Sequence, residues 1–348
     1  MILDQETLEP KPAVDDLLHA AQELEYPGLL KTELHASVVE LNTGVCESAQ
    51  DALERLMRLR KAAGAAAEEI GARIAAAGGH PIADPERLEI VDKPRYHGFL
   101  DYAGVSARRQ GVNGLHVHVG VRDSDSCFIA LEGVLPWLPL VLALSANSPY
   151  VAGAETGLKS NRAEVLAQLP RSGAPPAFRS YEEWEAFVER FRSSGVALGK
   201  DYTSFWWDIR PHPRFGTLEI RMPDQPTDVE RSAAIAALLQ ALCAGVLDGQ
   251  PRAHEPWERG VYQQNRWAAS RFGASAELIH PDEPRVASVA ELLSEVVELV
   301  GRVADNLGGT ALIGTLDATC EAEAQLEAGR TRGLATLCRE LVDRTLDF

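Results

Sequence analysis

The sequence has 348 residues, of which 45% are hydrophobic and 24% are charged, the composition of an ordinary folded protein rather than of a disordered one. Its net charge of −17 disfavours general binding to nucleic acid, because phosphate backbones are also negative. Five dispersed cysteines without a CxxC pair, and no basic N-terminal region before an apolar run, predict reduced thiols in a cytoplasmic protein. The longest apolar stretch, Val134–Ala146, contains two prolines and is too short to cross a bilayer, so we expect no membrane partner.

The N-terminal third mixes short polar-faced strands with one long helix. We expect a helix over Val14–Glu25 and a strand over Glu33–Leu41, where apolar and polar residues alternate. Helical spacing of apolar residues predicts a long amphipathic helix over Glu47–Ala77, ended by Gly78 and Gly79. Residues 80–110 are rich in Pro, Gly and Arg and are expected to be irregular.

The rest of the chain is expected to combine one hairpin with many helices. No repeat or flexible linker divides it, so we expect a single α+β domain over residues 1–348. The residues after Thr227 are expected to be almost entirely helical. The other predicted elements are a strand at Leu115–Val121, a buried helix at Asp125–Ala146, helices at Asn161–Gln168 and Tyr181–Arg192, and hairpin strands at Ser204–Arg210 and Thr217–Met222.

Two histidines on the strand Leu115–Val121 are the first candidate site residues. His116 and His118 lie two positions apart, so both imidazoles project from the same face of the strand. Gly114 and Gly120 flank them, and glycine allows a ligand to approach the backbone, so the pair suits a metal or a phosphate. The alternative is a solvated strand face with two ordinary histidines, and the pair alone does not decide between these readings.

Four charged residues on the predicted hairpin form a second candidate. Asp208 and Arg210 share a face of the first strand, and Glu219 and Arg221 share a face of the second. If these faces coincide, carboxylates for Mg²⁺ and guanidiniums for phosphate lie on one surface. The alternative is a pair of cross-strand ion pairs, each contributing on the order of 0.2–1 kcal/mol to stability.

Further charged residues are weaker candidates. Glu33 and Glu40 are seven residues apart, so an undistorted strand places them on opposite faces, and both reach one metal only if the strand bulges or ends early. Lys159 and Arg162 precede or open a helix and are positioned to clamp a substrate carboxylate, although a solvated helix start explains them equally. Cys127 lies in apolar surroundings and is expected in the core rather than as a nucleophile.

Taken together, seven segments in order along the chain resemble the type 2 glutamate–cysteine ligases, also called carboxylate–amine ligases. Seven ordered matches that span nearly the whole chain are far more specific than any one motif. The segments are Val39–Cys46, Gly114–Gly120, Leu144–Pro149, Gly157–Arg162, Trp207–Pro211, Gly216–Arg221 and Asn265–Trp267.

The resemblance implies a glutamine-synthetase-like fold, with a curved, mainly antiparallel sheet flanked by long helices, whose concave face holds ATP and Mg²⁺. It implies that ATP phosphorylates the γ-carboxylate of glutamate and that cysteine or another amine then attacks the acyl phosphate. By this likeness Glu40 and Glu219, with His116 or His118, hold Mg²⁺, Arg221 steadies the γ-phosphate and the acyl phosphate, and Arg162 binds the carboxylate substrate. We therefore expect Arg221, Glu219 and His116 to be catalytic. From the charge pattern we add Glu33 as a weaker metal candidate, and Lys159, Asp208 and Arg210 as candidates for substrate binding.

Family members open with a strand of the type Gly-x-Glu-x-Glu, and this sequence begins immediately after the place of that strand. We therefore expect either a start codon assigned too late or a degenerate homologue. Two alternatives to the ligase are a non-catalytic nucleotide- or amino-acid-binding homologue and a metal-dependent hydrolase that uses His116 and His118. The sequence leaves the amine acceptor and the oligomeric state open.

Overall fold

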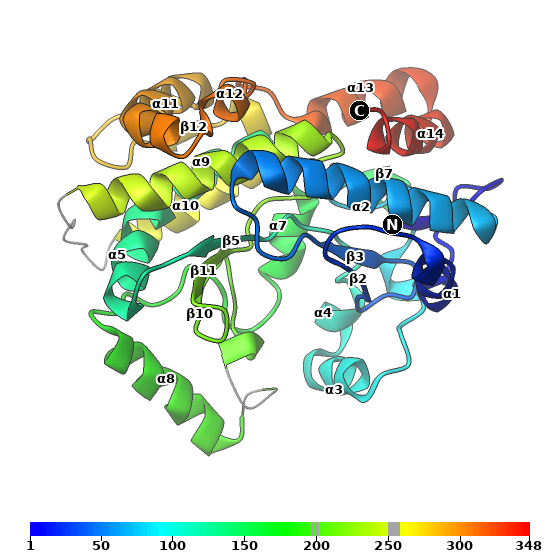
Figure 1. Ribbon diagram of the computed structural model, residues 1–348, viewed down its shortest axis with the longest axis horizontal. Coiled ribbons are helices and arrows are strands. Elements are labelled where there is room, and N and C mark those ends of the chain that lie inside the picture. Colours follow the sequence, from blue (N-terminus) through cyan, green and yellow to red (C-terminus); the bar gives the residue numbers. More distant parts are fainter. Residues whose placement is uncertain (197, 199–201, 250–257) are drawn as a thin grey trace.

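The computed structural model describes residues 1–196, 198, 202–249 and 258–348, in which long helices surround several short strands (Figure 1). The helices are α1 (Val14–Ala20), α2 (Ala49–Glu69), α3 (Pro94–Ala103), α4 (Val105–Arg108), α5 (Ser124–Val134), α6 (Leu138–Ser145), α7 (Asn161–Leu166), α8 (Tyr181–Ser194), α9 (Val229–Asp248), α10 (Glu258–Phe272), α11 (Val289–Asn306), α12 (Thr310–Ile313), α13 (Glu321–Arg332) and α14 (Leu334–Thr345). The strands are β1 (Ile2–Asp4), β2 (Leu29–Thr32), β3 (Val39–Asn42), β4 (Ala72–Ile74), β5 (Val117–Gly120), β6 (Tyr150–Val151), β7 (Ala154–Glu155), β8 (Ser172–Gly173), β9 (Trp206–Trp207), β10 (Ile209–His212), β11 (Thr217–Ile220), β12 (Glu277–Ile279) and β13 (Val286–Ser288).

The predicted mixture of helices with mainly antiparallel strands is confirmed. The described strands form one three-stranded sheet, in the order β10-β11-β5, and five two-stranded sheets. All the pairs are antiparallel except β8 with β9. The three-stranded sheet carries most of the predicted site residues, so its surroundings decide what they can do.

The predicted strand Glu33–Leu41 is wrong. β2 ends at Thr32 and β3 begins at Val39, and the two strands pair with each other as a hairpin. The reason lies in the connecting residues 34–36, which pair with a different segment. The Val91 N–H donates to the Leu34 carbonyl at 3.0 Å, and the Ala36 N–H donates to the Glu89 carbonyl at 2.9 Å. These long-range bonds replace the continuation of one strand.

The long helix is shorter than predicted. α2 begins after Ser48, whose side chain caps it by accepting a hydrogen bond from the Asp51 N–H. It ends near Gly71, which has a φ of +64°, and not at Gly78–Gly79. The next residues form β4, which pairs with β1. Alanine dominates residues 62–77 and fits either structure, so the sequence did not reveal this end.

The core lies where α9 packs against α2, α5 and α11, above the three-stranded sheet (Figure 1). Two helical stretches, Ser124–Ser145 and Val229–Asp248, are long and apolar enough to span a membrane by composition, and they are 83% and 61% buried inside the protein. The fold therefore uses both as core helices. The first, predicted as one helix, is interrupted by a 3₁₀ turn at Leu135–Trp137, which contains a proline.

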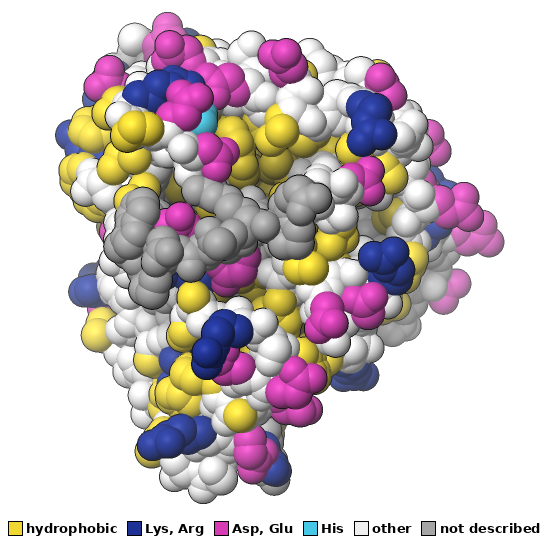
Figure 2. Space-filling view, turned by 90° about the vertical axis from the view of Figure 1, so that its left-hand side faces the viewer, with side chains coloured by type: hydrophobic (Ala, Val, Ile, Leu, Met, Phe, Trp, Pro, Cys, Tyr) yellow, Lys and Arg dark blue, Asp and Glu magenta, His cyan; other side chains and the backbone are white. Residues whose placement is uncertain are grey.

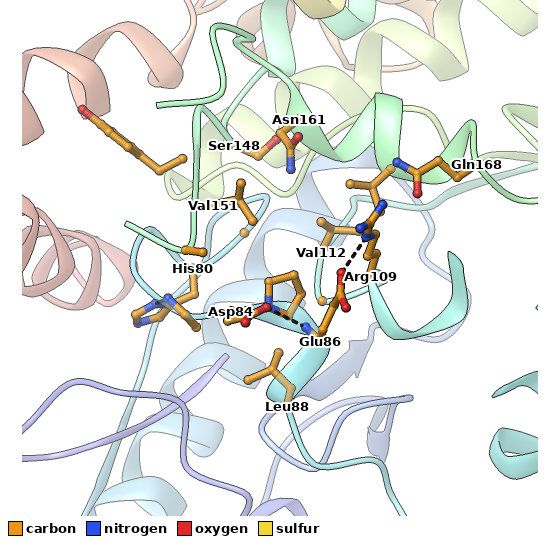
Figure 3. Close-up of a pocket in the computed structure, with 17 residues that line it drawn as sticks. His80, Asp84, Glu86, Leu88, Arg109, Val112, Ser148, Val151, Asn161 and Gln168 are labelled. Carbon is orange, nitrogen blue, oxygen red and sulfur yellow. Dashed lines mark hydrogen bonds and ion pairs between the residues drawn. The ribbon is translucent and has the colours of Figure 1, made fainter. Parts of the chain in front are cut away.

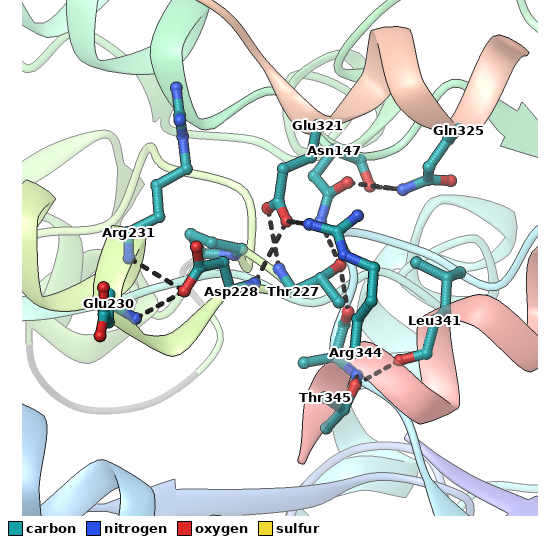
Figure 4. Close-up of polar contacts among 12 residues, drawn as sticks. Asn147, Thr227, Asp228, Glu230, Arg231, Glu321, Gln325, Leu341, Arg344 and Thr345 are labelled. Atoms are coloured by element: carbon teal, nitrogen blue, oxygen red, sulfur yellow. Dashed lines mark hydrogen bonds and ion pairs between the residues drawn. The ribbon is translucent and has the colours of Figure 1, made fainter. Parts of the chain in front are cut away.

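The C-terminal helices are fastened to the start of α9. The Glu321 carboxylate accepts hydrogen bonds from the Thr227 N–H at 2.8 Å, the Asp228 N–H at 3.1 Å and Arg344 at 3.0 Å (Figure 4). These bonds satisfy backbone donors at the beginning of α9 and place a negative charge at the positive end of the helix. Among the described residues after Thr227, the prediction of an almost entirely helical segment is confirmed, apart from the hairpin of β12 and β13, and residues 250–257 lie outside the described part of the chain.

The surface is predominantly acidic, as the net charge requires. On the face shown in Figure 2, acidic and basic side chains are interspersed among apolar ones rather than gathered by sign.

Candidate functional site

The three-stranded sheet brings candidate residues from distant parts of the chain into one row. Its register sets His118 of β5 opposite Glu219 of β11, and Glu219 opposite Arg210 of β10. The alternate residues Leu218 and Ile220 are fully buried in the core. The period-two pattern of the sequence therefore assigned the polar and apolar faces of β11 correctly.

Glu219 is the centre of this row. Its carboxylate accepts from Arg210 Nε at 2.6 Å and from a terminal nitrogen of Arg210 at 3.3 Å, a bidentate arrangement. Arg221 donates to the same carboxylate. Although burial alone would raise the pKa of Glu219, the guanidiniums of Arg221 and Arg210 hold that pKa well below its usual value. Glu219 is therefore a fixed negative charge throughout the neutral range.

Both histidines converge on this carboxylate. His116 Nδ1 lies 4.0 Å and His118 Nε2 lies 3.9 Å from Glu219 Oε1. His118 Nδ1 also contacts the Thr217 hydroxyl at 2.9 Å. Desolvation lowers the pKa of both imidazoles, and the charge of Arg221 lowers the pKa of His116 further. The predicted shared face is confirmed, and the rings stay neutral near pH 7.

We call His116, His118, Arg210, Glu219 and Arg221 the Glu219 cluster. Within it, Arg221 Nη1 lies 3.5 Å from His116 Nδ1, and the side chain of Arg221 is 18% exposed against 7% for Arg210. Arg210 is also held by the Phe205 carbonyl at 2.7 Å. Arg221 is therefore the guanidinium of the cluster that is better placed to meet an anion from outside.

The predicted five-residue metal site is not assembled in the described residues, among which no group of three or more acidic, histidine or cysteine side chains is placed to hold a metal. Glu40 pairs with Lys31 at 3.7 Å, and the Glu33 carboxylate accepts from the Leu34 N–H. Glu219 is engaged by its two arginines. In this arrangement the donors do not fit Mg²⁺.

Glu33 and Glu40 nevertheless lie near each other at the β2–β3 hairpin. Burial raises the pKa of Glu33, the charge of Glu40 raises it further, and the charges of Arg221 and Arg95 lower it. The early end of β2 thus leaves Glu33 within electrostatic range of both Glu40 and Arg221.

Asp208 does not join Glu219, which corrects the predicted pairing of two carboxylates. Its carboxylate accepts from the Tyr262 hydroxyl at 2.7 Å and from Arg266 Nε at 2.8 Å. Arg266 also lies 3.3 Å from Glu164. We call these four residues the Asp208 network. It ties the beginning of β10 to α10 and α7 through one oxygen of Asp208, Oδ2, which accepts both bonds.

Arg162 is likewise a supporting residue in this structure rather than an open clamp. Its guanidinium donates to the Met222 carbonyl at 2.8 Å and the Arg221 carbonyl at 2.9 Å, and it lies 3.8 Å from Asp224. A Cβ atom at Gly114 would overlap this guanidinium, so that glycine makes room for Arg162 and not for a ligand. Arg162 is 2% exposed, and it holds the end of β11 in place.

Lys159 has a different ionic partner from Arg162. Its ammonium pairs with Glu323 of α13 at 3.7 Å, so the predicted clamp of two cations is not formed.

Cys127 is buried, and burial raises the pKa of its thiol to about 12, which confirms the core assignment.

The sequence analysis missed a group of residues at the start of α3. Lys93 Nζ donates to the Thr32 hydroxyl at 2.6 Å, and the Tyr96 hydroxyl donates to the Thr32 carbonyl at 3.2 Å. Arg95 lies between them in sequence and stacks over the Tyr96 ring at 4.4 Å. These contacts put two cations beside Glu33. Pro94 at the first position of α3 was the available signal.

Comparisons with known proteins identify the family of this chain. The model of the glutamate–cysteine ligase family 2 matches residues 1–332. A Herpetosiphon aurantiacus protein, provisionally named glutamate–cysteine ligase 2, is 34% identical over 99% of this chain and 91% of its own length. A Rubrobacter xylanophilus protein, provisionally named glutamate–cysteine ligase 2-3, is 38% identical over 97% of this chain and 90% of its own.

Two solved structures share the fold at low identity. The glutamate–cysteine ligase of Francisella tularensis, in complex with AMP, has a TM-score of 0.65 and 12% identity, and the match covers 100% of this chain and 87% of that one. The bifunctional glutathione synthetase of Pasteurella multocida has a TM-score of 0.63 and 14% identity, and the match covers 99% of this chain and 50% of that one. These likenesses support the overall fold.

Proposed function

The chain belongs to the glutamate–cysteine ligase family 2, and from this membership and the Glu219 cluster we propose that it is an ATP-dependent carboxylate–amine ligase. The observation that carries the proposal is the setting of Arg221. A partly exposed guanidinium is fixed by Glu219 beside two neutral histidines, on the strand that matches the family. A cation held in this way is suited to charge that develops on a phosphoryl group.

The proposed reaction has two steps. A carboxylate oxygen attacks the γ-phosphorus of ATP and ADP leaves, which gives an acyl phosphate. The amine nitrogen then attacks the acyl carbon, phosphate leaves, and the nitrogen loses a proton. Arg221 would bind the transferring phosphoryl group in both steps, and Glu219 would keep Arg221 in position, because its carboxylate is shared by Arg210 and Arg221.

We propose glutamate as the carboxylate substrate and cysteine as the amine, with γ-glutamylcysteine as product. The support is the printed names of the relatives and of the solved ligase with AMP. We further propose that the chain forms a single catalytic domain and that its small sheets together form one curved sheet. We also propose that the protein is cytoplasmic. The five cysteines, all free of disulfides, are compatible with that location.

Mg²⁺ stays a prediction from the family resemblance. Because the described carboxylates and imidazoles do not form a three-ligand group, no step above is assigned to a metal. The same finding leaves the metal-dependent hydrolase without a specific observation in its favour.

A coupled assay of ADP release tests the proposed function. The protein is supplied with ATP, Mg²⁺ and glutamate, with and without cysteine or other amines, and the products are identified by mass spectrometry. We expect ADP in amounts equal to an amide product, and only when both carboxylate and amine are present. ATP binding without ADP release for any pair would instead identify a non-catalytic homologue and overturn the proposal.

A further inference from the structure

A separate cavity of about 310 Å³ lies outside the Glu219 cluster (Figure 3). It is formed by four segments that are distant in sequence: residues 79–88, 109–112, 148–152 and 161–168. At about 30 Å³ per water molecule, its volume corresponds to about ten waters. None of the five residues of the Glu219 cluster lines it, so a molecule inside it does not occupy the place proposed for the phosphoryl transfer.

The walls of this cavity are joined by hydrogen bonds between distant segments. The turn between β6 and β7 is held against the opposite wall, because the Ala152 N–H donates to the Ala83 carbonyl at 3.1 Å and the Gly153 N–H donates to the Pro81 carbonyl at 3.0 Å. Ala152 has a φ of +49°, a strained conformation for a residue with a side chain. His80 fixes the same wall by bonding to the Leu8 carbonyl at 2.9 Å. A pre-formed cavity of this kind suits a small ligand.

Two amide side chains in the lining, that of the half-buried Asn161 and that of the exposed Gln168, are open to a ligand. Asn161, at the start of α7, points into the cavity, and Gln168 lies at its edge (Figure 3). In the part of the chain that the structure describes, neither side-chain amide makes a hydrogen bond to protein. Each amide offers a donor and an acceptor, which matches a ligand that carries an uncharged polar group. Apolar walls between them come from Leu88, Val112, Val151 and Val165.

An ion pair lines the same cavity. Arg109 Nε donates to Glu86 Oε1 at 2.7 Å, and the two side chains are 46% and 41% exposed (Figure 3). An exposed pair contributes little to stability and can rearrange at small cost. A ligand with one carboxylate and one ammonium offers each partner an opposite charge, so it can bind both without leaving either charge unpaired.

We propose that this cavity is a second binding site, for a small zwitterionic amino acid whose side chain ends in an uncharged amide. Arg109 binds the α-carboxylate, Glu86 binds the α-ammonium, and Asn161 and Gln168 bind the amide. The site is distinct from the proposed catalytic centre and is linked to it through Arg162, whose N–H donates to the Ser148 hydroxyl of the cavity wall at 3.0 Å and whose guanidinium donates to the Arg221 carbonyl at 2.9 Å.

Calorimetric titration with L-glutamine tests the site. The titration uses an Arg221→Met background without nucleotide, so that binding at the proposed catalytic cluster does not contribute. We expect saturable binding at one site. N-acetyl-L-glutamine, which lacks the ammonium, should bind at least tenfold more weakly.

Three variants in the same background locate the site. Arg109→Met should weaken binding at least tenfold, and Val151→Phe should abolish it by filling the cavity. Arg108→Met, a change of the neighbouring exposed arginine, should leave binding unchanged. Circular dichroism checks that each variant is folded, and the exposed position of Arg109 keeps the test valid if Val151→Phe does not fold. Absence of saturable binding at millimolar L-glutamine, or binding that survives Arg109→Met, overturns the proposal whether or not the chain is a ligase.

Discussion

Two assemblies of carboxylate and arginine meet at the β10–β11 hairpin and differ in what surrounds them. In the Glu219 cluster, the carboxylate is buried but its neighbours His116 and His118 are 39% and 33% exposed. In the Asp208 network, Asp208 and Arg266 are 3% and 7% exposed, and Tyr262 donates a further hydrogen bond. One assembly meets solvent and the other is closed within the protein. A charged residue type on a strand therefore does not by itself distinguish a functional residue from a structural one. The exposure of its neighbours, and how many of its hydrogen bonds are already made within the protein, do distinguish them.

Glu219→Gln gives the largest expected difference between the two assemblies. Without the negative charge Arg221 loses the partner that fixes it, and turnover should fall by at least about 10²–10³-fold, the range for removal of one transition-state donor. ADP release under saturating substrates measures the effect, with circular dichroism as a check on folding. Glu164→Gln, a matched change in the Asp208 network, should retain most of the activity. Equal losses in both variants would contradict the division into site and support.

Arg266→Met should show the reverse pattern, with a large effect on stability. It leaves the buried Asp208 carboxylate without its ionic partner, which typically costs about 3–5 kcal/mol of unfolding free energy. Urea unfolding measures the change, and Arg108→Met, at an exposed position, is the control. A loss below about 1 kcal/mol would show that Asp208 is not held as the structure indicates.

A pH titration of stability, compared between the protein and a variant, tests the buried ionisation of His35. Burial lowers the pKa of His35 from 6.5 to about 4, so the folded protein binds this proton less readily than the unfolded chain. The stability that neutral His35 contributes is fully present above pH 6.5. It is lost as the pH falls to about 4, and the loss lowers the free energy of unfolding by about 3 kcal/mol. Glu219 has a lowered pKa and stays ionised over this window.

His35→Leu tests this assignment. Neither ring nitrogen of His35 has a hydrogen-bond partner among the described residues, so leucine should reduce the slope between pH 6.5 and 4 by the contribution of His35. The other histidines whose pKa is lowered keep their own contribution. His19→Leu, at an exposed position, should leave the slope unchanged. If stability in His35→Leu falls with pH as steeply as in the unchanged protein, groups other than His35 cause the loss of stability.

Gly114→Ala gives the smallest expected effect and tests the packing behind the site. The new methyl group overlaps the Arg162 guanidinium, which must shift, and overpacking of this kind costs about 1–3 kcal/mol. Gly120→Ala is the matched control, because no atom lies within 4 Å of the added Cβ. Thermal unfolding compares the stability of the two variants. Equal stability would mean that the Arg162 side chain can adopt another conformation without loss.

The sequence predicted the face of a strand better than the environment of a side chain. Alternation correctly brought His116 and His118 to Glu219, because side-chain direction on a strand is a local property. It did not reveal that Arg162 is enclosed by Arg221 and Met222 carbonyls, about 60 residues away, since burial depends on segments that meet only in the fold.

The errors in the predicted elements have the same origin. The hairpin at Glu33 depends on pairing of residues 34–36 with residues 89–91, and no local pattern encodes that contact. The end of α2 depends on β1, which takes the following residues into a sheet. Local propensity is a weak guide where long-range hydrogen bonds compete with it.

The bond between Glu321 and the first turn of α9 has a consequence for biosynthesis. α9 is the central helix of the core, yet its initial backbone donors at Thr227 and Asp228 are satisfied by a residue 93 or 94 positions later. A ribosome releases the chain from its N-terminus, so the middle of the molecule emerges well before Glu321. The innermost helix therefore acquires these two hydrogen bonds only after residue 321 has been made.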